Sequence, residues 1–127
     1  MEQGLVRKPR MLVVDDEAYV RETLHRWFVI RGFDVDMAQT GLEAVEKCNS
    51  NSYDVITMDL EMPVMTGAEA ISIIREKNPS VPILVLTGYV QVLDDNALHS
   101  VEKVLVKPVS LRKIEEEVRL LLGDRAP

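Results

Sequence analysis

Short runs of apolar and β-branched residues recur along the chain, each followed by a segment whose apolar residues lie three or four positions apart. The runs lie at 11–14, 55–58, 82–86 and 104–106, while 33–37 alternates apolar residues with aspartates. An uninterrupted run predicts a buried strand, and strict alternation predicts a half-exposed one. The pattern therefore predicts five strands.

The segments between these runs have the spacing of amphipathic helices. Their inward residues are expected to be Val20, Leu24, Trp27 and Phe28, then Leu42, Ala44, Val45 and Cys48, then Ala68, Ile71, Ile73 and Ile74, and last Leu111, Ile114, Val118, Leu121 and Leu122. A further short helix is predicted at 94–99. Helices that alternate with strands indicate the α/β class, with a parallel sheet covered by helices on both faces.

The chain has 127 residues and a net charge of −6. That length suits one domain with a real core, and the negative charge argues against general binding to nucleic acids or anionic membranes. The single Cys48 excludes an internal disulfide framework, and the run at 11–14 is too short for a signal peptide or a membrane span. We therefore predict a cytoplasmic domain at 10–123, with an N-terminal extension at 1–9 and a tail or the start of a linker at 124–127.

Polar side chains lie at the carboxyl ends of four of the predicted strands. Strand one ends on Asp15 and Asp16, strand three on Asp59, strand four on Thr87 and strand five on Lys107. In the flavodoxin-like strand order 2-1-3-4-5, strand two is an edge strand, and the other carboxyl ends meet at one crevice. We therefore predict a single flavodoxin-like domain with this order and a functional site at this edge of the sheet.

These residue types together indicate phosphoryl-transfer chemistry. Three carboxylates in one crevice repel one another unless cations join them, and Lys107 supplies only one positive charge. Mg²⁺, which prefers oxygen ligands and keeps several waters, suits such a cluster. A carboxylate can act as the nucleophile and become an aspartyl phosphate, while the metal and the lysine neutralise charge on the phosphoryl oxygens. The Thr87 hydroxyl can donate to one of those oxygens.

Each of these residues also has a simpler interpretation. Asp59 could cap a helix, and Asp15 with Asp16 could lie in a solvated turn. Thr87 could be an ordinary strand residue, and Lys107 could be a surface lysine. The combination of all of them at strand ends favours a site over these separate explanations.

Four segments resemble the receiver domains of two-component response regulators. They are V-V-D-D-E at 13–17, D-L-E-M-P-V-M-T-G at 59–67, L-T-G at 86–88 and V-K-P-V at 106–109. Each segment alone is a weak pattern, but together they occur in the family's order and extend over nearly the whole chain. This resemblance implies a signalling phosphoprotein that assists only its own phosphorylation and dephosphorylation, rather than an enzyme acting on other substrates.

The resemblance also implies roles for the acidic residues. Asp59 would be the phosphoacceptor and would contribute to the metal site. Asp16 would bind Mg²⁺ directly and Asp15 through water, and the backbone carbonyl of Glu61 would complete the site.

By the same resemblance, Thr87 and Lys107 would bind the phosphoryl group, and the Lys107–Pro108 peptide bond is expected to be cis. The family usually has an aromatic residue three positions before the lysine, where this chain has Val104. We therefore expect the output signal to pass through Gly88 and Tyr89 instead of an aromatic lever on strand five.

The expected partners follow from these roles. A histidine kinase or a phosphotransfer protein in a phosphorelay would donate the phosphoryl group and dock on the first helix, where Glu17, Arg21 and His25 are expected to be exposed. An effector domain or a downstream protein would bind the 90–122 face, and a homodimer is also compatible with the sequence. We expect no direct nucleic-acid binding and no membrane association by this domain.

Two other function classes remain open. A haloacid-dehalogenase-like phosphotransferase also forms an aspartyl phosphate beside Mg²⁺, but it requires a second aspartate two residues after the nucleophile, where this chain has Glu61. A degenerate receiver would act as an interaction module without ever being phosphorylated. Steady turnover of a phosphomonoester would favour the first class, and failure to take up phosphate from acetyl phosphate would favour the second.

Overall fold

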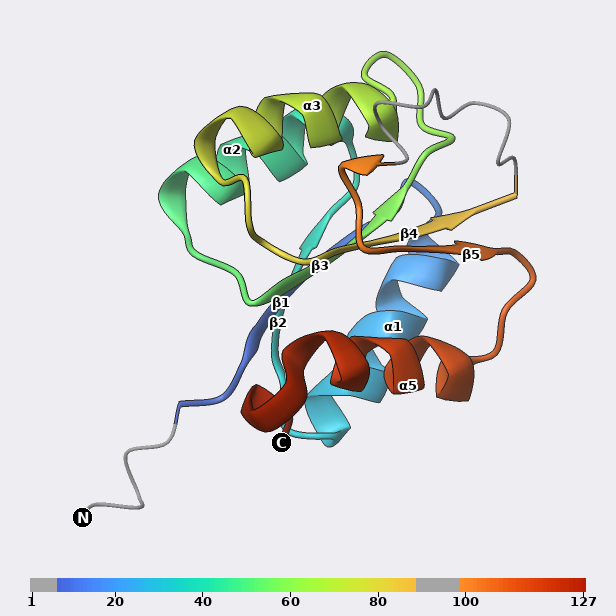
Figure 1. Cartoon of the computed structure of the whole chain (residues 1–127). Coiled ribbons are helices and arrows are strands. Elements are labelled where there is room, and N and C mark those ends of the chain that lie inside the picture. The colour runs from blue at the N-terminus through green and yellow to red at the C-terminus, as the bar shows by residue number, and fades with distance from the viewer. Residues whose placement is uncertain (1–6, 89–98) are drawn as a thin grey trace.

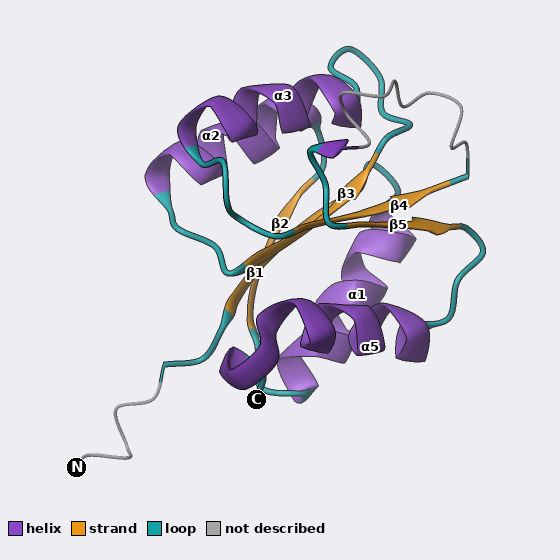
Figure 2. Ribbon diagram, in the orientation of Figure 1, coloured by secondary structure: helices purple, strands orange, loops and turns teal. Residues whose placement is uncertain are grey.

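The computed structural model describes residues 7–88 and 99–127. Its centre is a parallel sheet in which the strands lie in the order β2-β1-β3-β4-β5 (Figures 1 and 2). The strands are β1 (Arg10–Val14), β2 (Asp34–Ala38), β3 (Val55–Asp59), β4 (Ile83–Thr87) and β5 (Lys103–Val106). The predicted fold class and strand order are therefore confirmed.

Helices cover both faces of the sheet, with α2 and α3 on one side and α1 and α5 on the other (Figure 1). Their bounds are α1 (Ala18–Ile30), α2 (Gly41–Ser50), α3 (Gly67–Lys77) and α5 (Leu111–Leu122), and a 3-10 turn follows at Gly123–Arg125. The helix predicted at 94–99 lies outside the described residues except for its last position. Across the described ranges, no helix is both long and apolar enough to span a membrane.

Successive residues of each central strand alternate between two apolar cores. In β1, Met11 and Val13 pack toward α1 and α5, whereas Leu12 and Val14 pack toward α2 and α3. This alternation explains why the central strands have uninterrupted apolar runs, because both of their faces are covered.

The sequence misplaced two apolar residues. Val106, in a run that predicts a buried strand, is 52% exposed at the end of β5. Leu42 was expected to face the core, but its side chain is 54% exposed. The buried face of α2 instead includes Gly41 and Ala44, and the backbone of Gly41 lies against Met65. Leu42 follows Gly41 directly and therefore points about 100° away from it around the helix.

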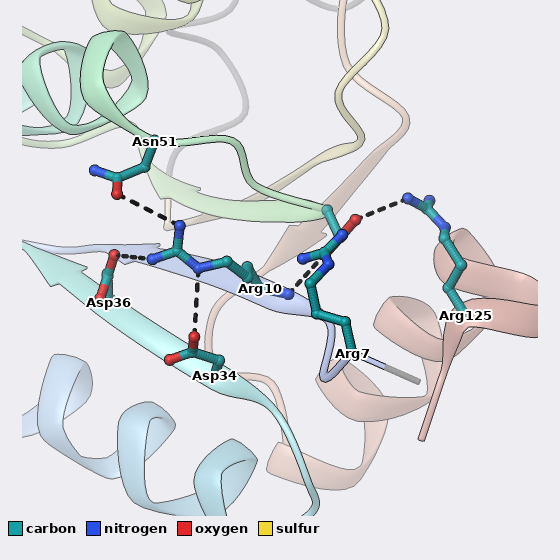
Figure 3. A network of polar contacts seen from close by, with 7 residues as sticks. Arg7, Arg10, Asp34, Asp36, Asn51 and Arg125 are labelled. Atoms are coloured by element: carbon teal, nitrogen blue, oxygen red, sulfur yellow. Dashed lines mark hydrogen bonds and ion pairs between the residues drawn. The ribbon is translucent and has the colours of Figure 1, made fainter. Parts of the chain in front are cut away.

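A network of charged residues joins both terminal segments to the amino edge of the sheet (Figure 3). The buried Asp54 carboxylate accepts hydrogen bonds from the Arg10 backbone N–H at 2.7 Å, from Arg125 at 3.1 Å and from Arg7 at 3.4 Å. The Arg10 guanidinium contacts Asp34, Asp36 and Asn51. Both terminal segments are therefore held at the edge opposite the carboxyl ends of the strands.

Candidate functional site

Three carboxylates meet at the carboxyl edge of the sheet. Asp15, Asp16 and Asp59 each offer an oxygen within 4.8 Å of the others. The sheet produces this arrangement because Val14 of β1 is paired with Met58 of β3, so the next residue of each strand emerges at the same level. Asp15 and Asp59 are 1% and 3% exposed, whereas Asp16 is exposed.

Lys107 reaches this cluster from the end of β5. Its backbone N–H donates to the Thr87 carbonyl at 2.8 Å, and its ammonium lies 3.0 Å from an Asp15 oxygen and 3.9 Å from an Asp59 oxygen. Burial lowers the pKa of Lys107, but the hydrogen bond to Asp15 and the charges of Asp15 and Asp59 raise it to a greater extent. The Lys107–Pro108 bond is cis, which is the isomer expected from the sequence.

Asp59 lies in an environment that disfavours its charge. Burial raises the pKa of Asp59 to about 6, and the charges of Asp15 and Asp16 add to this effect. The Glu61 N–H, 3.2 Å from the carboxylate, and the Lys107 charge lower the pKa but do not outweigh the burial. One lysine therefore does not balance the negative charge, and the site fits a hard cation with oxygen ligands.

Every polar group of Asp15 is engaged. One carboxylate oxygen accepts the Glu17 N–H at 2.9 Å, and the other accepts Lys107. Its backbone N–H donates to the Ala38 carbonyl at 3.1 Å, and its own carbonyl accepts from Arg21 at 2.9 Å. These bonds leave Asp16 as the more accessible carboxylate of the pair.

The contact with Asp15 corrects the prediction that Arg21 belongs to an exposed docking surface. Arg21 and His25 are half-buried rather than exposed, and the Arg21 guanidinium donates to the backbone at the end of β1. Glu17, expected in the first turn of α1, is the residue just before the helix begins.

The remaining predicted site residues lie on neighbouring segments. Thr87 ends β4 with a fully buried side chain, and Val104 is half-buried against the core beneath α2 and α3. The Glu61 carboxylate accepts the Gly88 N–H at 3.2 Å, a contact that the sequence did not predict. Tyr89 lies outside the described residues.

A glycine allows α3 to begin close to the phosphoacceptor candidate. A Cβ atom at Gly67 would lie 2.1 Å from the Asp59 carbonyl oxygen and 2.8 Å from the Leu60 Cα. Both contacts are with backbone, so a larger residue would force β3 and α3 apart. Thr66 and Glu69 form a reciprocal capping box that fixes the start of the helix.

An apolar groove, which we call the α1–α5 groove, opens beside Lys107. It has a volume of about 640 Å³ and is lined by Tyr19, Val20, Thr23, Leu24, Leu86, Lys107, Pro108, Val109, Ser110, Leu111 and Ile114. Tyr19 at its rim is 81% exposed. The sequence predicted the two helices but not the groove between them, because the groove depends on how the segment after Lys107 packs against α1.

Comparisons with known proteins agree with this geometry. The sequence model of the response regulator receiver domain matches residues 11–119. The transcriptional regulatory protein PrrA of Mycobacterium tuberculosis is 35% identical over 123 residues, which cover 94% of this chain and 52% of that protein. The chain thus spans about half the length of the curated relatives it matches.

Solved structures show the same similarity. Response regulator protein TrrA from Thermotoga maritima, in complex with Mg²⁺ and BeF, is 35% identical and superposes with a TM-score of 0.82, over 90% of this chain and 99% of that one. TrrA in complex with the histidine kinase ThkA gives a TM-score of 0.81 at 35% identity, over 91% of this chain and 99% of that one. The chain therefore belongs to the response regulator receiver domain family.

Proposed function

We propose that Asp59 accepts a phosphoryl group from a phosphohistidine of a histidine kinase or a phosphotransfer protein. The observation that carries this proposal is the convergence of the buried Asp59 carboxylate with two other carboxylates and Lys107 at the ends of three strands. An Asp59 oxygen attacks phosphorus, and the phosphorus–nitrogen bond of the donor breaks. The bonding electrons leave with the imidazole, and an acyl phosphate remains on Asp59.

The residues around Asp59 have separate roles in this step. Lys107 already lies within ion-pair distance of both Asp15 and Asp59, so it can follow the new charge onto a phosphoryl oxygen. Thr87 ends the neighbouring strand β4 and can donate its hydroxyl to another phosphoryl oxygen. The protein thereby assists its own phosphorylation and dephosphorylation without acting on another substrate.

We propose Asp16, Asp59 and the Glu61 backbone carbonyl as direct Mg²⁺ ligands. Asp15 would hold the ion through water, because both of its carboxylate oxygens already accept hydrogen bonds. When bound, Mg²⁺ would supply positive charge against the phosphoryl oxygens. The similarity to TrrA, which was solved with Mg²⁺ and BeF, supports this assignment.

We propose the α1–α5 groove as the docking site of the phosphodonor. The groove is apolar, adjoins Lys107 and leaves Tyr19 exposed, which is typical of a surface that a protein partner covers. The complex of TrrA with the histidine kinase ThkA supports a kinase as the partner.

The output would start at the end of β4 and use a face that shares α5 with the docking groove. Movement of Thr87 toward the phosphate would alter the backbone at Gly88, and the change would reach an effector domain or a downstream protein through the 90–122 face. Val104 is too stiff and small to act as a lever. The receiver would span 10–123, with 1–9 as an extension and 124–127 as a tail or linker start, and the length of the relatives supports a further domain in the full protein.

The test of the phosphoacceptor is the mass of the intact protein after incubation with acetyl phosphate and Mg²⁺. The wild type should gain one phosphoryl group, and Asp59→Asn should gain none. Asp124→Asn, which removes an exposed carboxylate outside the site, should label like the wild type. Equal labelling of Asp59→Asn would refute the assignment, and an unlabelled wild type would favour the degenerate receiver.

A further inference from the structure

The backbone that carries the two adjacent aspartates is held by a side chain from α1. The Arg21 guanidinium donates to the Asp15 carbonyl at 2.9 Å, and the Arg21 backbone N–H bonds to the Glu17 carbonyl at 3.0 Å as part of the first helical turn. Arg21 is therefore fixed to the helix at its backbone and to the end of β1 at its side chain.

The Asp15 carboxylate holds this loop from the strand side by accepting the Glu17 N–H, whereas α1 itself contributes little besides Arg21. Glu17 makes no side-chain cap, and the first turn carries no acidic residue. In the described chain, no other side chain of α1 bonds to the backbone of residues 15–17. Arg21 thus ties α1 to the end of β1, whereas the capping threonines of α2 and α3 accept N–H groups of their own first turns.

The position of this bond gives it a consequence for Asp16. The Asp15 carbonyl and the Asp16 nitrogen and Cα belong to one planar peptide unit. A donor that fixes the direction of that carbonyl also fixes where the Asp16 nitrogen and Cα lie, and hence the point from which the Asp16 side chain leaves the backbone. Asp16 is exposed and has no hydrogen bond of its own within the described residues, so its orientation depends on this backbone.

We infer that Arg21 is a positioning residue that orients the Asp15–Asp16 peptide and thereby presents the Asp16 carboxylate to a divalent cation together with Asp59. This inference rests on the proposed metal site. It makes Arg21 a support of the loop behind the phosphorylation site rather than part of the surface that a partner contacts.

Charge and position predict opposite effects for the loss of Arg21. A guanidinium near a cation site repels the cation, so charge alone predicts that Arg21→Met binds Mg²⁺ more tightly. Loss of a hydrogen bond that orients a ligand weakens metal binding, commonly by about tenfold or more. The sign of the change therefore separates the two effects.

The experiment compares Mg²⁺ binding, followed by backbone amide shifts, in the wild type and three variants. Arg21→Met should weaken binding by about tenfold, and Arg21→Lys, which keeps a donor, should recover most of that loss. Arg26→Met removes an exposed arginine of the same helix and should bind like the wild type. Unchanged or tighter binding by a folded Arg21→Met would overturn the inference.

A second measurement needs no metal. Hydrogen exchange of the Glu17 amide, which donates to Asp15, should be faster in metal-free Arg21→Met than in the wild type or Arg26→Met. Equal exchange rates would contradict the positioning role. If the wild type itself bound no Mg²⁺, the proposed metal site would fail, while the exchange rates would still decide whether Arg21 holds the loop.

Discussion

Thr57 provides a direct test of how well the core beneath the site is understood. It lies in β3 between Val13 of β1 and Leu84 of β4, two residues before Asp59. Its side chain is 1% exposed, and its hydroxyl has no hydrogen-bond partner among the described residues. Replacement with valine exchanges that hydroxyl for a methyl group of nearly the same size.

The expected gain follows from the cost of an unpaired polar group. A buried hydroxyl without a partner costs about 1–3 kcal/mol relative to its hydrated state. Thr57→Val removes that cost without opening a cavity, so we expect the free energy of unfolding to rise by about 1–2 kcal/mol. For a domain of this length, the thermal midpoint should rise by roughly 4 °C for each kcal/mol.

Urea unfolding followed by Trp27 fluorescence measures this change. Trp27 is the single tryptophan, and its indole N–H donates to Glu115 of α5 at 2.9 Å, so its signal reports the packing of α1 on α5. Thr66→Val is the matched control, because the Thr66 hydroxyl caps α3 and its loss should cost about 1 kcal/mol. A Thr57→Val protein that is equally or less stable than the wild type would refute the reasoning.

Two further predictions concern the site and its docking surface. Burial raises the pKa of metal-free Asp59 to about 6, so protons compete with Mg²⁺ for this carboxylate. The Kd for Mg²⁺ measured by calorimetry should therefore rise about tenfold between pH 7 and pH 5. A Kd that does not change with pH would contradict this, and Asp59→Asn should weaken the pH dependence of the Kd. Tyr19→Ser should slow phosphoryl transfer from a histidine kinase by roughly tenfold and spare transfer from acetyl phosphate. The exposed Leu120→Ser is its control, and equal loss with both donors would place Tyr19 in the chemistry instead.

The sequence predicted the parts of the site that depend on topology alone. A parallel sheet brings the carboxyl ends of adjacent strands together, so the strand order was enough to place Asp15, Asp59 and Lys107 in one cluster. The hydrophobic pattern predicted that the central strands are buried on both faces, and the polar strand ends together with the flavodoxin-like topology supplied the order. This prediction needs no knowledge of side-chain rotamers.

The contacts that the sequence missed depend on where long side chains turn. Arg21 looked like an exposed helical residue, and only the structure shows its guanidinium at the Asp15 carbonyl. The bond between Glu61 and Gly88 joins two loops and has no periodic signature. The contact of Asp54 with Arg125 joins residues 71 positions apart, and neither residue lies in a motif.

Asp15 and Asp16 show most clearly why residue type alone does not define a role. They are chemically identical neighbours, yet Asp15 is buried with all of its polar groups bonded and Asp16 is exposed. Successive residues at a strand end point in opposite directions, so only one of them can turn beneath Lys107. The two Asp15 oxygens already accept the Glu17 N–H and Lys107, so Asp15 is better placed to orient a water or the lysine than to bind the metal directly. The accessible Asp16 can exchange water for a cation without breaking a bond inside the protein. The orientation of Asp16 should therefore set the strength of metal binding, and we infer that the Arg21 contact controls this orientation.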